Sequence, residues 1–95
     1  MNRLVITPLA ASDIEEIGDY IAQDNPLAAI RMDELFEAVV GRLAEHPLIG
    51  RPGQVPGTRE LIPHESYRLV YELQADTVWI LALVHTAPLW PATRS

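Results

Sequence analysis

Several arginines and histidines in the second half of the chain are the residues best suited to catalysis. They are Arg51, Arg59, His64, Arg68 and His85, followed by Trp90. In a small antiparallel sheet, these residues could gather on the face that the helices leave uncovered. Arginine can stabilise the charge that develops on a phosphodiester under attack, and histidine can transfer a proton, so this set could cleave a phosphodiester without a metal ion. The structural alternative is that Arg59 and Arg68 form surface ion pairs worth less than about 1 kcal/mol each. The possible acidic partners are Glu60, Glu65 and Glu72. On residue types alone, the structural alternative is slightly favoured.

Other catalytic motifs are not evident in the sequence. It has no phosphate-binding loop, nucleophile elbow, zinc signature or dinucleotide fingerprint. The spacing of His46, His64 and His85 is not typical of metal ligands, and Ser66 near His64 lacks an orienting acid for a triad. The chain contains no cysteine, which excludes disulfides and thiol chemistry. We therefore expect neither a metal nor a cofactor.

The strand that should organise the fold is the unbroken apolar run at residues 78–84. This run is too short to cross a membrane and is typical of a strand buried on both faces. Residues 67–73 alternate apolar and polar side chains, which predicts a half-buried strand. Between the two strands, Ala75 and Asp76 would form a tight hairpin turn.

Two helices are predicted in the first half of the chain. Thr7 can cap a helix that starts at Pro8, and Asn25 can cap a second helix that starts at Pro26 and ends near residues 46–47. Apolar side chains recur at intervals of three and four along both helices. They are Leu9, Ile14, Ile17 and Ile21 on the first helix, and Met32, Leu35, Phe36, Val39 and Leu43 on the second. The short connection predicts an antiparallel helical hairpin whose apolar stripes pack on a sheet.

The remaining segments complete that sheet. Residues 4–6 and 58–62 are predicted strands, residues 49–57 a loop rich in glycine and proline, and residues 63–66 a turn. The element order is β-α-α-β-β-β, which defines an α+β fold with a helical hairpin packed on a small, twisted, mostly antiparallel sheet. We expect a single domain that spans residues 1–95.

The negative charge of the chain is concentrated in the predicted helices. The net charge is −6, and the first fifty residues carry nine acids against three arginines. Nonspecific nucleic-acid binding is disfavoured because it requires a basic field. An acidic helical face suits a basic protein partner, although simple solvation explains most such charge runs. No signal peptide is evident, so we expect a cytoplasmic protein that does not enter the membrane.

Four sequence motifs follow one another along nearly the whole chain. They are TPLAASDIEEIGDYIAQDNPLAA, LAEHPLIGRPG, GTRELIPHESYRLVYEL and VWILALVHTAPLWP. In this order they resemble the RelE/ParE family of type II toxin–antitoxin toxins. The resemblance implies the fold inferred above and a cognate antitoxin, usually encoded beside the toxin, whose flexible tail wraps it. It also implies one of two activities, either ribosome-dependent cleavage of messenger RNA in the RelE branch or poisoning of DNA gyrase in the ParE branch.

The ParE branch is favoured, and with it a toxin that is not an enzyme. The acidic balance and the absence of lysine are unlike RelE-type nucleases, which use several basic residues to engage RNA. The GRPG and GTREL segments look more like ParE. A metal-independent messenger RNA endonuclease and an inactive module that only binds antitoxin stay open as alternatives.

The resemblance also implies roles for individual residues. Arg59 and His85 match positions that tend to be functional in the family and are the candidate catalytic pair. The expected target-binding residues are Arg51, Arg68 and Trp90. The expected antitoxin-binding residues lie on the two helices and are Ile17, Tyr20, Asp24, Asp33 and Glu37, although core packing would also explain Tyr20.

One departure from the family pattern concerns the residues before the final tryptophan. Relatives commonly have an arginine and a polar residue there, whereas this chain has Pro88 and Leu89. The change removes a charged bidentate donor and introduces a rigid residue that has no N–H group. It predicts a weakened or inactive toxin.

Overall fold

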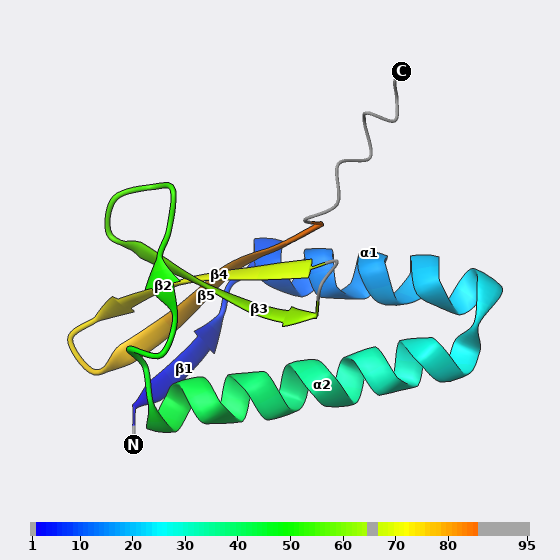
Figure 1. Cartoon of the computed structure of the whole chain (residues 1–95), viewed down its shortest axis with the longest axis horizontal. Helices are drawn as coiled ribbons and strands as arrows, with labels where there is room; N and C mark the ends of the chain where they lie inside the picture. The colour runs from blue at the N-terminus through cyan, green and yellow to red at the C-terminus, as the bar shows by residue number, and fades with distance from the viewer. Residues whose placement is uncertain (1, 65–66, 86–95) are drawn as a thin grey trace.

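The computed structural model describes residues 2–64 and 67–85, and Figure 1 shows two helices beside one twisted sheet. The elements are β1 (Arg3–Ile6), α1 (Pro8–Asp24), α2 (Pro26–Glu45), β2 (Arg51–Pro52), β3 (Thr58–His64), β4 (Tyr67–Gln74) and β5 (Thr77–His85). The five strands lie in the order β1-β5-β4-β3-β2. Neighbouring strands are antiparallel except β1, which runs parallel to β5. The predicted α+β fold, with a helical hairpin on a mostly antiparallel sheet, is confirmed.

Side-chain caps start both helices where the sequence predicts. Thr7 Oγ1 accepts a hydrogen bond from the N–H of Ala10 (3.3 Å), and Asn25 Oδ1 accepts one from the N–H of Ala28 (3.1 Å). Asn25 also ends α1, because its own N–H donates to the carbonyl of Ile21 (2.9 Å). A single residue therefore links the two helices, and each such cap stabilises its helix by about 1 kcal/mol.

Two polar side chains at the start of α1 attach this helix to β5. Thr7 Oγ1 donates to the carbonyl of Ile80 (2.8 Å), and Asp13 Oδ2 accepts from the N–H of Leu83 (3.1 Å). The two bonds lie on either side of Leu81. This residue forms a β-bulge, because the adjacent Val70 and Tyr71 of β4 pair with Ala82 and Ile80 and leave Leu81 without a β4 partner. The start of α1 is thus fixed at the point where β5 bends.

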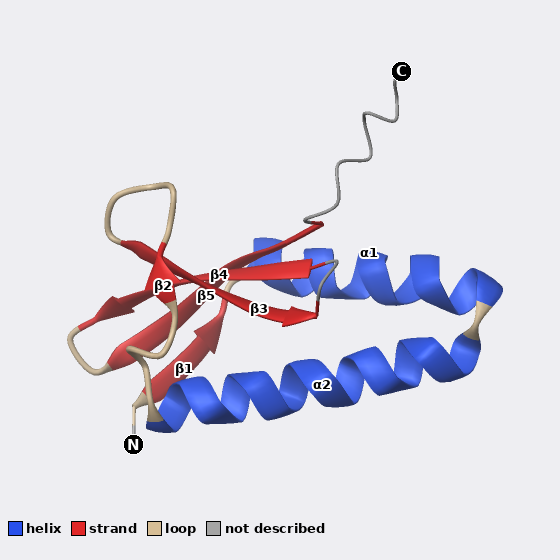
Figure 2. Ribbon diagram, viewed as in Figure 1, coloured by secondary structure: helices blue, strands red, loops and turns tan. Residues whose placement is uncertain are grey.

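The core lies between the helices and one face of the sheet. Tyr67, Leu69 and Tyr71 alternate along β4, are at most 5% exposed and face the helices, as predicted. The other buried apolar residues are Ala10 of α1, Phe36, Val39 and Leu43 of α2, and Val78, Ile80 and Leu83 of β5. Figure 2 shows both helices on this side, so the opposite sheet face, called here the open face, has no described helix over it.

The inward position predicted for Leu9 is wrong. Leu9 is 63% exposed, whereas the neighbouring Ala10 is fully buried. The bond from Thr7 to β5 sets the rotation of α1, and adjacent helical residues point about 100° apart. Ala10 therefore takes the position on the sheet, and Leu9 turns towards solvent.

Three predictions about the sheet and its connections also need correction. The run at residues 78–84 is not buried on both faces, because Val84, on the open face, is 37% exposed. An apolar run reports only that a strand forms, and it cannot report whether a second layer covers it. The predicted loop at residues 49–57 contains β2, which pairs with β3. The first two residues of the predicted turn at 63–66 instead belong to β3, which continues to His64, and the other two lie outside the described residues.

The segment after α2 is fastened to the centre of the sheet by the hydroxyl of Tyr71. Tyr71 Oη donates to the carbonyl of Pro47 (2.7 Å) and accepts from the N–H of Gly50 (2.9 Å). Tyr71 is fully buried. A Cβ added to Gly50 would lie 2.5 Å from Tyr71 Oη, so this approach of backbone to side chain requires glycine.

Replacing Tyr71 by phenylalanine should lower the free energy of unfolding by about 1–3 kcal/mol, because two buried backbone groups lose their partner. Urea denaturation followed by circular dichroism measures the change. Tyr20→Phe is the matched control, since Tyr20 is 67% exposed, and it should cost less than about 0.5 kcal/mol. Equal effects in the two variants would contradict the role given to the Tyr71 hydroxyl.

Stability should also fall at alkaline pH. Burial raises the pKa of Tyr71 above the ordinary tyrosine value of 10.0, against the opposing effects of the Gly50 N–H and Arg59. Burial also raises the pKa of Tyr67, with Tyr20 as the smaller cause. A phenol whose pKa is higher in the folded chain stabilises the fold fully below a pH of about 10, and this contribution is lost as pH rises through the folded pKa. The free energy of unfolding should therefore fall above this pH, and less steeply in Tyr71→Phe; identical pH dependence in the two proteins would argue against this.

Candidate functional site

Arg59, one of the two expected catalytic residues, contacts the segment after α2. Arg59 Nη1 donates to the carbonyl of Gly50 (2.8 Å) and, at longer range, to that of Leu48 (3.5 Å). Arg59 pairs with Tyr71 across β3 and β4, and directly paired residues share a face of the sheet. Arg59 and Tyr71 therefore hold the same backbone segment from the same side.

His85, the other expected catalytic residue, lies against α1. It pairs with Tyr67 across β4 and β5, and the two rings meet edge to face with centroids 4.8 Å apart. The Nδ1 atom of His85 is buried and has no hydrogen-bond partner among the described residues. The His85 and Tyr67 rings, with Glu16, Ile17 and Tyr20 of α1, line a groove of about 340 Å³. We call it the aromatic groove.

The structure does not bring Arg59 and His85 together. Both lie on the helix-facing side of the sheet, but their β4 partners, Tyr71 and Tyr67, are four residues apart, which is about 13 Å along a strand. The buried Leu69 lies between those partners. The expectation that this arginine and this histidine gather on the open face is wrong, because alternation turns both towards the helices and the strand register separates them.

Arg51 and Arg68 do meet on the open face, around the carboxylate of Glu60. Glu60 Oε1 lies 3.6 Å from Arg68 Nη1 and 4.0 Å from Arg51 Nε, and Glu60 Oε2 accepts from the N–H of Gln54 (3.3 Å). Glu60 is 6% exposed. Arg68 thus forms the ion pair that the structural alternative predicts, except that its carboxylate is buried. The side chain of Arg51 is 61% exposed and can meet a partner.

Four positions singled out in the sequence are wholly or partly outside the description. Trp90, Pro88 and Leu89 belong to residues 86–95, which lie outside the described residues, and the side chain of His64 is likewise not described. Within residues 2–64 and 67–85, no group of three or more His, Asp or Glu side chains could hold a metal ion. No helix in these ranges is long and apolar enough to span a membrane.

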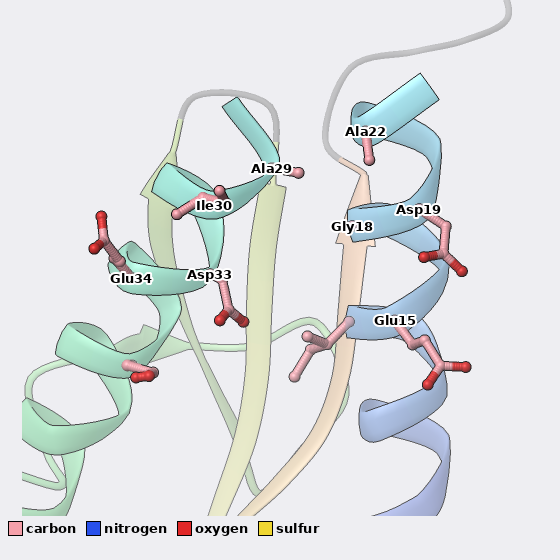
Figure 3. A pocket seen from close by; sticks show the side chains of 10 residues that line it. Glu15, Gly18, Asp19, Ala22, Ala29, Ile30, Asp33 and Glu34 are labelled. Atoms are coloured by element: carbon pink, nitrogen blue, oxygen red, sulfur yellow. The ribbon is translucent and has the colours of Figure 1, made fainter. Parts of the chain in front are cut away.

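A second depression lies between the two helices, and Figure 3 shows it with Asp33 projecting from α2 into the space towards α1. Its volume is about 620 Å³, and a Cβ added to Gly18 would meet no atom within 4 Å. The lining combines apolar or small residues, Ile14, Gly18, Ala22, Ala29 and Ile30, with the carboxylates of Glu15, Asp19, Asp33, Glu34 and Glu37. We call it the acidic cleft.

The two depressions lie on opposite sides of α1. Tyr20 lines the aromatic groove and Ala22 lines the acidic cleft, and two residues of a helix separated by two positions point about 160° apart. A partner that fills both depressions must therefore pass around α1.

The expected antitoxin-binding residues divide between these two depressions. Ile17 and Tyr20 line the aromatic groove, and Asp33 and Glu37 line the acidic cleft. Asp24 is exposed at the end of α1 and lines neither. The core interpretation of Tyr20 is wrong, since Tyr20 is 67% exposed. Contact of these residues with an antitoxin stays a prediction.

Sequence reasoning missed the residues that create the depressions. Gly18 and Ala22 lie four residues apart on α1, and their small side chains leave the space that forms the acidic cleft. Small residues at this spacing on a helix could have predicted a depression beside it. Tyr67 is the residue missed at the aromatic groove. Its pairing with His85 depends on the bulge in β5, which the sequence does not reveal.

Comparison with solved structures identifies the class of protein to which this fold belongs. The chain matches a structure described as the chromosomal ParDE toxin–antitoxin system from P. aeruginosa with a TM-score of 0.81 and 24% identity, covering 92% of this chain and 98% of that one. It also matches the RelBE2 toxin–antitoxin complex from Mycobacterium tuberculosis with a TM-score of 0.60 and 25% identity, covering 88% and 96%. The fold is that of the small α+β toxins of toxin–antitoxin systems.

Sequence comparison then gives the family. Residues 4–90 match the model of the ParE toxin of the type II toxin–antitoxin system, parDE. The chain is 39% identical over 91 residues to "Putative toxin Y4kP" of Sinorhizobium fredii, covering 95% of this chain and 94% of that protein. It is 36% identical over 89 residues to Toxin RelE2 of Caulobacter vibrioides, covering 94% and 100%. The chain belongs to the ParE toxin family and is the toxin of a type II toxin–antitoxin module.

Replacing Arg68 by methionine should lower the free energy of unfolding by about 1–3 kcal/mol, because the buried Glu60 carboxylate loses its nearer cation and keeps the more distant Arg51 and the N–H of Gln54. Arg51→Met, at an exposed position, is the matched control and should cost less than about 1 kcal/mol. Adding Glu60→Gln to Arg68→Met should recover part of the loss, since no unpaired buried charge remains. Urea denaturation measures all three, and equal costs for the two arginine variants would refute the assignment.

Proposed function

We propose that this toxin acts on DNA gyrase and is neutralised by a cognate antitoxin bound at its helical hairpin. The observation that carries the gyrase proposal is the match of residues 4–90 to the ParE toxin model. The similar solved structures are described as ParDE and RelBE2 toxin–antitoxin systems, which supports an antitoxin partner for this chain as well.

The acidic cleft is the proposed docking surface for the antitoxin. It combines an apolar interior that a helix or an extended segment can bury with five carboxylates at its sides. A basic amphipathic segment complements both features, since opposite charges steer association and the apolar interior supplies burial. Asp33 and Glu37 of α2 are the expected contacts, and Asp24 lies within reach of a segment that leaves the cleft at the tip of the hairpin.

The open face is the proposed target-binding surface. No described helix covers it, so a large partner can approach it from outside. Arg51 is the exposed cation there, and Arg68 lies beside it around Glu60. Arginine is frequent among the residues that dominate protein–protein binding. Arg51 and Arg68 are therefore proposed gyrase contacts, and Trp90 is proposed as a third from the family resemblance alone.

Ribosome-dependent cleavage of messenger RNA is the second candidate, because Toxin RelE2 is 36% identical to this chain. The proposed catalytic pair would then be Arg59 and His85. Two observations weigh against it. The net charge is −6 without any lysine, and the β4 partners of Arg59 and His85 are four residues apart. We therefore favour action through a protein interface rather than enzyme catalysis. The third candidate, an inactive antitoxin-binding module, rests on the departure at Pro88 and Leu89.

A gyrase supercoiling assay and an in vitro translation assay, run side by side with the same purified toxin, separate these candidates. We expect inhibition of supercoiling, relief of that inhibition by the antitoxin, and intact messenger RNA on the ribosome. Cleavage of ribosome-bound messenger RNA would assign the nuclease activity instead. A protein that binds antitoxin but is inert in both assays would be the inactive module.

Pro88→Arg is the companion variant for the same assays. It restores a charged bidentate donor before the final tryptophan, so gyrase inhibition and growth arrest should both increase. Ala87→Arg adds the same charge one position earlier and should have the smaller effect. Unchanged toxicity in Pro88→Arg would contradict the idea that Pro88 weakens this toxin.

A further inference from the structure

The aromatic groove brings together residues that the sequence assigns to two different roles. Ile17 and Tyr20 are expected antitoxin contacts, and His85 is an expected catalytic residue, yet all three line one groove of about 340 Å³. We infer that this groove receives a large aromatic side chain from the antitoxin and that this side chain covers His85. The inference rests on the proposed antitoxin partner and specifies how part of it binds.

The lining of the groove favours an aromatic occupant. Three rings, those of Tyr20, Tyr67 and His85, line the space together with the aliphatic side chain of Ile17. Tyr67 and His85 already pack edge to face at 4.8 Å, which is the geometry that another ring can extend. Tyr20 is 67% exposed, so an occupant would bury a large aromatic surface that is now in water. Buried aromatic anchors of this kind commonly dominate a protein interface.

Charge distinguishes a protein side chain from a nucleobase as the occupant. The carboxylate at the groove belongs to Glu16, while Glu15 and Asp19, on the cleft side of α1, add negative charge at longer range. The phosphate that accompanies a nucleobase would be repelled by this acidic helix. A basic residue beside the aromatic anchor would instead be attracted. The predicted anchor is therefore an aromatic residue with a lysine or arginine close to it in the antitoxin sequence.

Occupation of the groove gives the antitoxin a direct means of neutralisation. The groove lies across α1 from the acidic cleft, so an antitoxin segment in the cleft can continue around α1 and place its anchor beside His85. The chain passes from His85 directly into the residues that include Pro88 and Trp90. An anchor in the groove would therefore lie beside the residue that immediately precedes this segment, and the family resemblance assigns target contact to Trp90 within it.

The first test uses N-acetyl-L-tryptophanamide as a probe of the groove. Titration followed by NMR should give saturable shifts of the Ile17 methyl groups and of the Tyr20 and His85 rings, and adenosine monophosphate should give none at the same concentration. Tyr20→Ala should weaken probe binding at least fivefold. Leu27→Ala, which removes an exposed apolar side chain of α2 outside the groove, should leave it unchanged. Shifts only at the acidic cleft, or stronger shifts with the nucleotide, would overturn the inference.

The second test uses the short protein encoded beside the toxin gene. Tyr20→Ala should weaken its binding at least tenfold and Leu27→Ala less than twofold. In the wild-type complex, His85 should be protected from modification by diethylpyrocarbonate, whereas the exposed His46 gives the unprotected reference.

The outcomes separate this inference from the function on which it rests. If the neighbouring protein does not bind the wild-type chain, the proposed antitoxin partner fails, and the inference fails with it. If that protein binds Tyr20→Ala as tightly as wild type, or leaves His85 as reactive as in the free toxin, the inference alone is overturned.

Discussion

Alternation along β4 determines which residues of this toxin can act together. Tyr67, Leu69 and Tyr71 point to the helices, so Arg68 and Val70 between them point to the open face. Strand pairing carries this division across the sheet, because paired residues share a face. Arg59 therefore shares the face of its partner Tyr71, and His85 shares the face of its partner Tyr67. Glu60 shares the opposite face with its partner Val70. The basic residues that the sequence suggests as one site are thereby divided between the two faces of the sheet.

This division gives the two sides of the toxin different properties. The helical side carries the acidic cleft and the aromatic groove, with carboxylates and exposed rings suited to a basic, flexible partner. The open face carries Arg51 and Arg68, arranged around the buried carboxylate of Glu60. Arg59, on the helical side, is occupied by the carbonyls of residues 48 and 50 and works with Tyr71 to hold the backbone after α2. His85 lies at the other end of the same side, because its β4 partner Tyr67 is four residues from Tyr71, the β4 partner of Arg59.

Local signals in the sequence predicted the framework well. Thr7 and Asn25 cap the helices as expected, because capping depends only on a side-chain oxygen and the next helical turn. The alternation of Tyr67, Leu69 and Tyr71 gave the correct inward face of β4. The fold class followed from the order of these elements, while the extent of the domain stays a prediction.

The features that the sequence did not reveal depend on contacts between distant segments. The burial of Ala10 in place of Leu9 follows from the bond between Thr7 and Ile80, seventy-three residues apart. The bulge at Leu81, stabilised by Asp13, sets the register that places His85 beside Tyr67. Neither is encoded by local periodicity, and the grouping of candidate site residues failed for the same reason. The partners of the candidate residues are set by strand register and by the bulge.

Backbone hydrogen exchange of the toxin, alone and bound to its antitoxin, tests most directly whether the helical side is the neutralising surface. The account predicts slower exchange in α1, in α2 and at the end of β5 in the complex, with little change in β2 and β3. Protection confined to β2, β3 and β4, with the two helices unchanged, would contradict it, because the antitoxin would then cover the open face instead.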